Sequence, residues 1–263
     1  MPRMPPLSLA EARDELVAAG ITGPHQSHSR RDNLYKIHAL LGGDPEAAFG
    51  MSLGAAYSHS DVLGFVSAVT GCSTDLDDVA GNDTIDPDRT IRALVEGARR
   101  LAAAATTGAT LLALTGHPTG LLEHHIRVVD AFERAGGKVV RLRETEKLAF
   151  GNGRAEVRYV GGVGCLADGA SLKHTHSAEA MEALLESGPW PDLVLGDHGF
   201  AGAAIERGIA TIGVMDINDP ALAVASATRG DVTVIPMDDN RPPRLYAPAW
   251  RIFETILCGG GVE

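Results

Sequence analysis

Short apolar runs recur in the second half of the chain and alternate with segments whose apolar residues have helical spacing. The runs are TLLALT at 110–115, KVVRL at 138–142, DLVLG at 192–196, TIGVM at 211–215 and VTVIP from Val232. Helical spacing occurs at about 118–135, 178–187, 200–207 and 219–227. This alternation predicts an α/β fold: a mostly parallel open sheet with helices on both faces. Two further runs meet at Gly161-Gly162 within 155–167 and predict a hairpin.

The first part of the chain carries helix signals and no strong strand signal. Ser8 has the character of an N-cap with Glu11 as its capping-box partner. The helices we expect are Ser8 to about Ala19, Asn33–Leu41, Ser60–Thr70, and one from Asp86-Pro87 to about Ala105. The sequence therefore predicts a helical amino-terminal region over 1–105, packed as a cap on an α/β core over 106–263.

Composition narrows the class of protein. A length of 263 residues suits one large α/β domain, or a helical cap with an α/β core. The net charge of −11 argues against a nucleic-acid partner. No apolar run approaches the roughly 18 residues that span a bilayer, and the start of the chain lacks the apolar core of a secretory signal. The three cysteines are far apart and odd in number, so we expect no disulfide framework and a cytoplasmic location. A homodimer is the default expectation for the assembly.

The segment that follows the first strong strand predicts an anion site. Thr115, Gly116, His117, Thr119 and Gly120 surround the expected junction between strand and helix. Ligands bind beyond the carboxyl ends of parallel strands, and the free N–H groups of a helix start attract anions. This pattern favours a binding site for a phosphate or carboxylate group, with one histidine beside it. The alternative is a tight turn with a capping role only.

Acidic and imidazole side chains also follow the later strands. His174 and His176 alternate, so on a strand they would share one face and could bind a metal or an anion. Asp197 and His198 follow the run at 192–196 as a pair suited to metal ligation or acid/base chemistry. Oxygen ligands for a hard cation such as Mg²⁺ follow the run at 211–215; they are Asp216, Asn218 and Asp219. Capping by Asp219 is the alternative, and the later Asp238 and Asp239 could equally join the site or lie in a solvated loop.

The amino-terminal region offers polar groups as well. SHSRRDN at 27–33 supplies Arg31 and Asn33, and an arginine can hold a phosphate with two hydrogen bonds. GNDTIDP at 81–87 places several oxygen side chains beside a turn. Helix capping and solvated charge are the alternative for both segments.

With these motifs, the chain resembles a family of actinobacterial proteins described only as phosphatases. The resemblance rests on RRDN, GNDTIDP, LTGHPTGLL, LKHTHS, DLVLGDHGFAGAA, GVMDINDPAL and MDDN, and it extends from about Arg30 to Tyr246. It implies phosphomonoester hydrolysis and is compatible with a role in secondary metabolism. The chain lacks the DxDxT motif of haloacid-dehalogenase phosphatases, the RHG motif of histidine phosphatases, CxxxxxR and the GxxxxGK[ST] loop. A phosphatase of this sequence therefore needs a site of its own.

Our leading hypothesis is a metal-assisted phosphomonoesterase acting on a small phosphorylated metabolite, a sugar phosphate or a nucleotide. Asp197, Asp216, Asn218 and Asp219 would hold Mg²⁺ or another divalent cation. His117, His176 or His198, together with Asp197, would carry the catalysis, because an imidazole pKa lies near neutrality. The phosphate would contact Thr115, Gly116, Thr119, Gly120, Arg31, Asn33 and His174. The alternatives are a lyase, cyclase or isomerase acting on an amino acid or sugar acid, similar to D-glutamate cyclases in the second half only, and a non-catalytic binding module.

Overall fold

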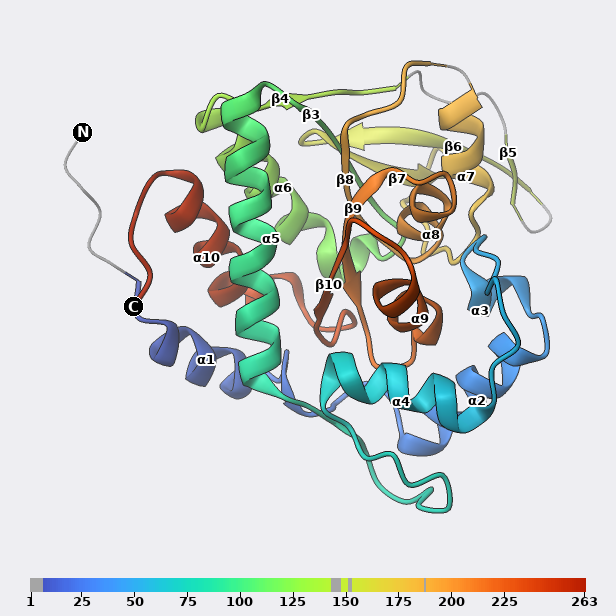
Figure 1. The fold of residues 1–263 in the computed structure, drawn as a ribbon. Helices are drawn as coiled ribbons and strands as arrows, with labels where there is room; N and C mark the ends of the chain where they lie inside the picture. The colour runs from blue at the N-terminus through green and yellow to red at the C-terminus, as the bar shows by residue number, and fades with distance from the viewer. Residues whose placement is uncertain (1–6, 143–147, 151–152, 187) are drawn as a thin grey trace.

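The computed structural model describes residues 7–142, 148–150, 153–186 and 188–263. Within them the main sheet has eight strands, in the order β10-β9-β8-β3-β7-β6-β5 with β4 also paired to β3 (Figure 1). The strands are β3 (Thr110–Thr115), β4 (Lys138–Val139), β5 (Leu148–Phe150), β6 (Gly153–Val160), β7 (Val163–Ala167), β8 (Leu193–Asp197), β9 (Ala210–Met215) and β10 (Val232–Pro236). Only the pairings of β6 with β7 and with β5 are antiparallel. The predicted mostly parallel sheet and the hairpin are therefore confirmed.

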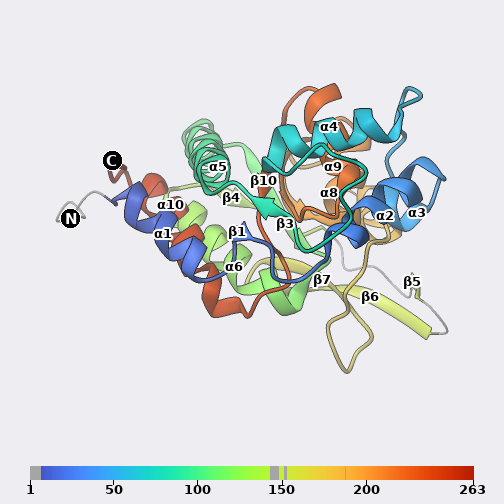
Figure 2. The same ribbon diagram turned by 90° about the horizontal axis from the view of Figure 1, so that it is seen from below.

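Helices cover both faces of this sheet. They are α1 (Leu9–Ala18), α2 (Arg30–Leu41), α3 (Pro45–Ala48), α4 (His59–Thr70), α5 (Pro87–Thr107), α6 (Pro118–Arg134), α7 (Glu179–Glu186), α8 (His198–Glu206), α9 (Pro220–Thr228), the 3₁₀ helix η1 (Pro243–Tyr246) and α10 (Ala247–Leu257). Figure 2 shows α1, α5, α6 and α10 on one side, and α2, α4, α8 and α9 on the other. Two short strands, β1 (Gly23–Pro24) and β2 (Thr84–Ile85), form a separate antiparallel pair.

The strand sequences explain why both faces are covered. Side chains along a strand point alternately to opposite faces. In β3, Leu111 and Ala113 pack with α5, α6 and α10, whereas Leu112 and Leu114 pack with α7 and α8. All four side chains are buried. A strand with apolar residues at both alternating positions is stable only between two helical layers, as the continuous run predicted.

The predicted strand at 138–142 is shorter than its apolar run. Only Lys138 and Val139 pair, with Thr110 and Leu111 at the start of β3. From Ala113 onward the same edge of β3 is paired with β7. Because β7 takes this edge, β4 ends after its second residue.

Amino-terminal residues pack in two of the hydrophobic clusters of the core. Ala12 and Leu16 of α1 pack in the cluster that contains α5 and α10, whereas Ile37 and Val62 pack with α9. Ser8 caps α1 by accepting from the backbone N–H of Glu11, as predicted. The predicted division into a cap over 1–105 and a core over 106–263 stays a prediction.

Candidate functional site

The carboxyl ends of five neighbouring parallel strands meet at one edge of the sheet. Each end is followed by polar residues, in the spatial order β10, β9, β8, β3 and β7. A cavity of about 260 Å³ lies there. Its lining residues are His28, Lys36, His117, Thr119, His174, His176, His198, Asn218, Asp219, Asp239 and Asn240. The cavity therefore lies at the strand ends, and residues that follow β10, β9, β8 and β3 contribute to its lining.

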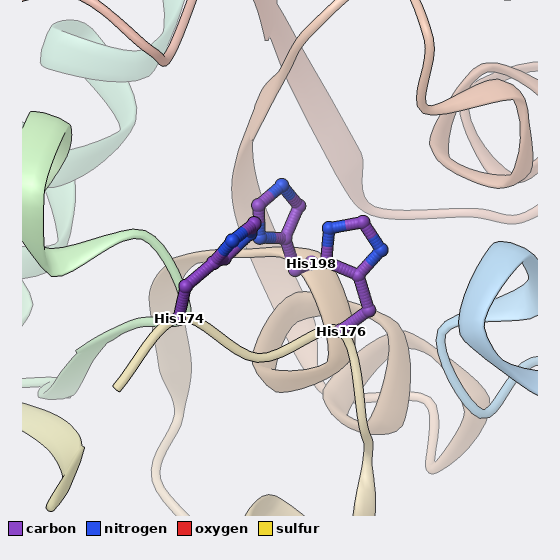
Figure 3. Close-up of side chains that lie close together, drawn as sticks. All are labelled: His174, His176 and His198. Carbon is purple, nitrogen blue, oxygen red and sulfur yellow. The ribbon is translucent and has the colours of Figure 1, made fainter.

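Four imidazoles cluster in this cavity. The ring of His198 lies 4.4 Å from that of His176 and 5.3 Å from that of His174, measured between centroids. The ring of His117 lies 4.6 Å from that of His174. Figure 3 shows the rings of His174, His176 and His198 gathered in one place, the first two from one loop and the third from the start of α8. The structure therefore brings together every histidine that the sequence assigned to the site.

The loop that carries His174 and His176 is not the strand that the alternation suggested. Only Leu172 forms an isolated bridge there, and residues 173–177 are irregular. Thr175 lies between the two histidines, and its N–H donates to the carbonyl of Gly116 at 2.9 Å. This contact anchors the loop on the end of β3. Both rings consequently reach the cavity, although the reason is this anchor and not a shared strand face.

His198 is the central residue of the cluster. Its backbone lies in the left-handed region at φ 44°, which is rare for a residue with a side chain and often marks functional sites. Its Nε2 lies 3.0 Å from Oδ2 of Asp239 and 3.6 Å from Oδ2 of Asp219, and its Nδ1 lies 3.5 Å from Oδ1 of Asp197. Burial lowers the pKa of His198, but Asp219, Asp239 and Asp197 outweigh it and raise this pKa to about 10.

The neighbouring histidines are shifted in the opposite direction. Burial and the proximity of His198 lower the pKa of His174 to about 4. Burial and the charges of His198 and His174 lower the pKa of His176 to about 3. Both imidazoles are consequently neutral near pH 7. A neutral imidazole offers a nitrogen lone pair, as a metal ligand must.

The carboxylates around His198 also have shifted pKa values. Burial, together with the charges of Asp239 and Asp216, raises the pKa of Asp219 to about 8, despite the opposing effect of His198. Burial raises the pKa of Asp239 too, but its close contact with His198 outweighs burial and leaves this pKa below the ordinary value. Shifted titrations of this kind concentrate at functional sites.

Asp197 lies beneath the cavity and does not line it. It is fully buried, and its Oδ1 accepts the N–H of Gly116 at 2.7 Å. Its Oδ2 lies 3.7 Å from Nε2 of the buried His125. Burial raises the pKa of Asp197 against the opposing effect of His198. The geometry suits a residue that orients His198 and the turn after β3.

Three groups in the described part of the chain could each hold a cation. In each group, ligand atoms from three side chains lie within 4.8 Å of one another. The groups are His174/His176/His198, His198/Asp219/Asp239 and His25/Asp216/Asp238. Of the predicted ligands, Asp216 and Asp219 enter different groups, and Asp197 enters none. Asn218 lines the cavity beside Asp219.

Gly116 in the turn after β3 and Gly120 in the first turn of α6 have a packing role. A Cβ on Gly116 would lie 2.4 Å from the carbonyl oxygen of Thr175, and one on Gly120 would lie 2.0 Å from that of Asp239. Thr115 accepts the N–H of His117 through its Oγ1 at 3.0 Å. The turn therefore needs glycine because neighbouring backbone approaches it closely. Phosphate binding at Thr115, Gly116, Thr119 and Gly120 stays a prediction.

Of the predicted phosphate-binding residues, Thr119 and His174 line the cavity, whereas Thr115, Gly116, Gly120, Arg31 and Asn33 do not. Arg31 is exposed on α2. Asn33 is buried, and its Nδ2 donates to Oδ2 of Asp83 at 2.7 Å. The neighbouring Arg30 is buried as well and pairs with Oδ1 of the same carboxylate. This part of the RRDN motif thus stabilises the segment around Asp83.

Sequence reasoning missed three basic residues of the amino-terminal region. His28 and Lys36 line the cavity, and His25 contacts Asp216 with Nε2 2.6 Å from Oδ1. His28 lies inside the SHSRRDN motif, which we interpreted only through its arginines and asparagine. The spacing of His25 and His28, three residues apart just before a capped helix, was the available signal.

Comparison with known proteins identifies the relatives of this chain. The model of a family described as Phosphatase matches residues 7–255. The chain belongs to this phosphatase family. It is also 40% identical over 221 residues to Phosphatase SCO2771 of Streptomyces coelicolor, with 82% of each chain covered. The resemblance to an actinobacterial phosphatase family is confirmed, and both matches support a hydrolase of the phosphatase class. Across the described residues, no helix combines the length and apolarity needed to cross a membrane.

Proposed function

We propose that the protein is a metal-assisted phosphomonoesterase that releases phosphate from a small phosphorylated metabolite, a sugar phosphate or a nucleotide. The observation that carries this proposal is the convergence of five imidazoles and two carboxylates on a single cavity of about 260 Å³. Membership of the phosphatase family supports the reaction class. The cavity residues support the metal dependence and the small size of the substrate.

The donor set fits a divalent cation. His174 and His176 have lowered pKa values and are neutral, and their rings face His198. Asp239 and Asp219 lie near Nε2 of His198, and a cation bound here would replace the proton that their charges favour on this ring. Imidazole nitrogens suit Zn²⁺ and similar ions, whereas carboxylates suit Mg²⁺ and Mn²⁺. The mixed set favours Mn²⁺ or Zn²⁺ over Mg²⁺. A cation bound by these residues would supply Lewis acidity to the phosphoryl group.

The remaining cavity residues suit phosphate binding and proton transfer. Lys36 and the hydroxyl of Thr119 line the cavity and can contact phosphate oxygens. His117 is buried, and its Nδ1 has no hydrogen-bond partner within the described structure. An imidazole nitrogen without a partner beside the reacting group can give a proton to the leaving oxygen or take one from water. We assign this acid/base role to His117.

Asp197 would act through His198. Carboxylates commonly hold the second nitrogen of a metal-ligating histidine and so fix its ring. Asp197 Oδ1 lies 3.5 Å from His198 Nδ1, so its charge acts on this ring at ion-pair distance without a direct hydrogen bond. In this proposal Asp197 is a positioning residue, because it does not line the cavity.

The test is phosphate release from a panel of sugar phosphates and nucleotides, with Mg²⁺, Mn²⁺ or Zn²⁺ supplied and then removed by a chelator. We expect release that depends on the cation and falls at least about 100-fold in His176→Ala. Lys173→Ala is the matched control, because this neighbouring side chain pairs with Asp168 at 2.5 Å on the surface. Activity that survives chelation would remove the metal from the proposal. A change in substrate mass without phosphate release would favour the lyase, cyclase or isomerase.

A further inference from the structure

A second cluster of potential cation ligands lies beside the cavity, built from three distant parts of the chain. His25 follows β1, Asp216 follows β9 and Asp238 follows β10. The Nε2 of His25 lies 2.6 Å from Oδ1 of Asp216 and 3.7 Å from Oδ2 of Asp238. All three side chains are buried. None of them belongs to the histidine cluster assigned to the proposed reaction.

Each member of this cluster is held in place by a further contact. The Nδ1 of His25 accepts the backbone N–H of His28 at 3.0 Å, and this contact fixes the ring with Nε2 directed at Asp216. Asp216 Oδ1 accepts the N–H of Ile217 at 2.6 Å. Asp238 accepts from the hydroxyl of Ser27 at 2.6 Å. Ligands held by outer contacts of this kind are typical of metal sites in proteins.

Among the residues that the structure describes, the two buried carboxylates of the cluster have only histidines as basic neighbours. Within the described residues, Asp216 and Asp238 pair only with histidines, and neither has a lysine or arginine partner. Oδ2 of the fully buried Asp216 has no hydrogen-bond partner in the same part of the structure. Buried carboxylates are costly unless they are paired or coordinate a metal. Oδ2 of Asp216 faces His28, whose Nε2 lies 3.6 Å away, so the cluster borders the cavity.

We propose that His25, Asp216 and Asp238 bind a second divalent cation, which ties the amino-terminal segment to the ends of β9 and β10. One imidazole and two carboxylates form a mixed donor set that Mn²⁺ or Zn²⁺ satisfies. By fixing His25, the cation sets the position of His28 on the cavity. The site goes beyond the proposed phosphatase reaction and does not depend on it, because no ligand is shared with the histidine cluster.

The experiment counts metal ions in the full-length protein. The protein is dialysed against Mn²⁺, and bound manganese is measured by elemental analysis and by the electron paramagnetic resonance signal. We expect two ions per chain in the wild type, one in His25→Gln, one in His198→Asn and none in the double variant. His59→Gln is the matched control and should retain two ions, because His59 is an exposed surface residue. Asp238→Asn serves as the second variant if His25→Gln fails to fold, as judged by circular dichroism.

A second readout follows the amino-terminal segment. In His198→Asn, Mn²⁺ should still slow proteolysis of residues 24–33, and this protection should be absent from His25→Gln. One ion in both the wild type and His25→Gln, without metal-dependent protection, would overturn the second site and leave the proposed phosphatase site intact. One ion in His198→Asn with activity that ignores metal would instead support the second site and overturn the metal role in the proposed function. If neither the wild type nor any variant binds an ion, both the second site and the metal role in the proposed function are wrong.

Discussion

Nε2 of His198 and Oδ2 of Asp239 lie 3.0 Å apart, so the first residue of α8 and the loop after β10 meet across the end of β9. The ring of His198 also contacts those of His117, His174 and His176. This one side chain links the imidazoles on one side of the cavity to the carboxylates on the other. Its loss should therefore disrupt both halves of the site.

We expect His198→Asn to lower kcat/KM for phosphate release by at least about 100-fold, because the variant loses the shared donor nitrogen. Asn is chosen because it tolerates the left-handed backbone at φ 44° better than most residues. The substitution should therefore add little backbone strain, and the thermal midpoint should fall mainly because Asp219 and Asp239 lose their basic partner. The measurement is steady-state kinetics beside thermal unfolding. Wild-type kcat/KM in a folded variant would remove His198 from the site.

The positions of the strands and of their polar ends could be predicted because each depends on local sequence. β3 was predicted with its observed bounds, since six consecutive residues able to face two helical layers precede Gly116. His198 and Asp216 were recognised because they directly follow such strands. Where a strand ends and a helix begins depends on residues that are close together in the sequence. The spacing of apolar residues could therefore predict it.

The contacts across the site could not be predicted in the same way. His25 and Asp216 are 191 positions apart, and no local pattern specifies that they meet. The loop with His174 and His176 reaches the cavity through the bond between Thr175 and Gly116, which again joins distant segments. The predicted metal set of Asp197, Asp216, Asn218 and Asp219 is divided in the structure, because Asn218 and Asp219 line the cavity, Asp216 contacts His25 and Asp197 lies outside the cavity lining.

Gly120→Ala should destabilise the protein and impair the site together. The added Cβ would lie 2.0 Å from the carbonyl oxygen of Asp239, so the loop after β10 must shift. We expect a loss of about 1–3 kcal/mol in the free energy of unfolding and a fall in activity, because Asp239 faces His198. Gly64→Ala in the interior of α4 is the control, since nothing lies within 4 Å of its Cβ position. That change should raise stability by up to about 1 kcal/mol, measured by urea unfolding. Equal effects of the two substitutions would contradict the close approach.

Stability should depend on pH through a buried histidine outside the cavity. Burial lowers the pKa of His124 to about 4, whereas the unfolded chain has the ordinary value near 6.5. The unfolded chain therefore binds a proton between these values that the folded chain does not bind. Consequently the free energy of unfolding falls as pH falls through this window, by up to about 3 kcal/mol from this residue.

The measurement for His124 is the difference between two pH profiles, because the raised pKa values of buried carboxyl groups act in the opposite direction. Urea unfolding of the wild type and of His124→Gln is compared between pH 7 and pH 4.5. We expect the variant to lose less stability than the wild type as pH falls. His38→Gln on the exposed face of α2 should leave the profile unchanged. Parallel profiles for the wild type and His124→Gln would show that His124 is not held neutral.

The two adjacent arginines of the RRDN motif should behave differently. Arg30 is 2% exposed and pairs with the buried Asp83, which also accepts from Asn33. Arg30→Ala leaves that carboxylate without its cation, so we expect a loss of about 3–5 kcal/mol in the free energy of unfolding. Arg31→Ala removes an exposed side chain and should change stability by less than about 0.5 kcal/mol. Chemical denaturation measures both, and phosphate release by Arg31→Ala tests whether this side chain contacts the substrate. A drop of 10-fold or more in its kcat/KM at unchanged stability would place Arg31 over the phosphate, as the sequence first suggested.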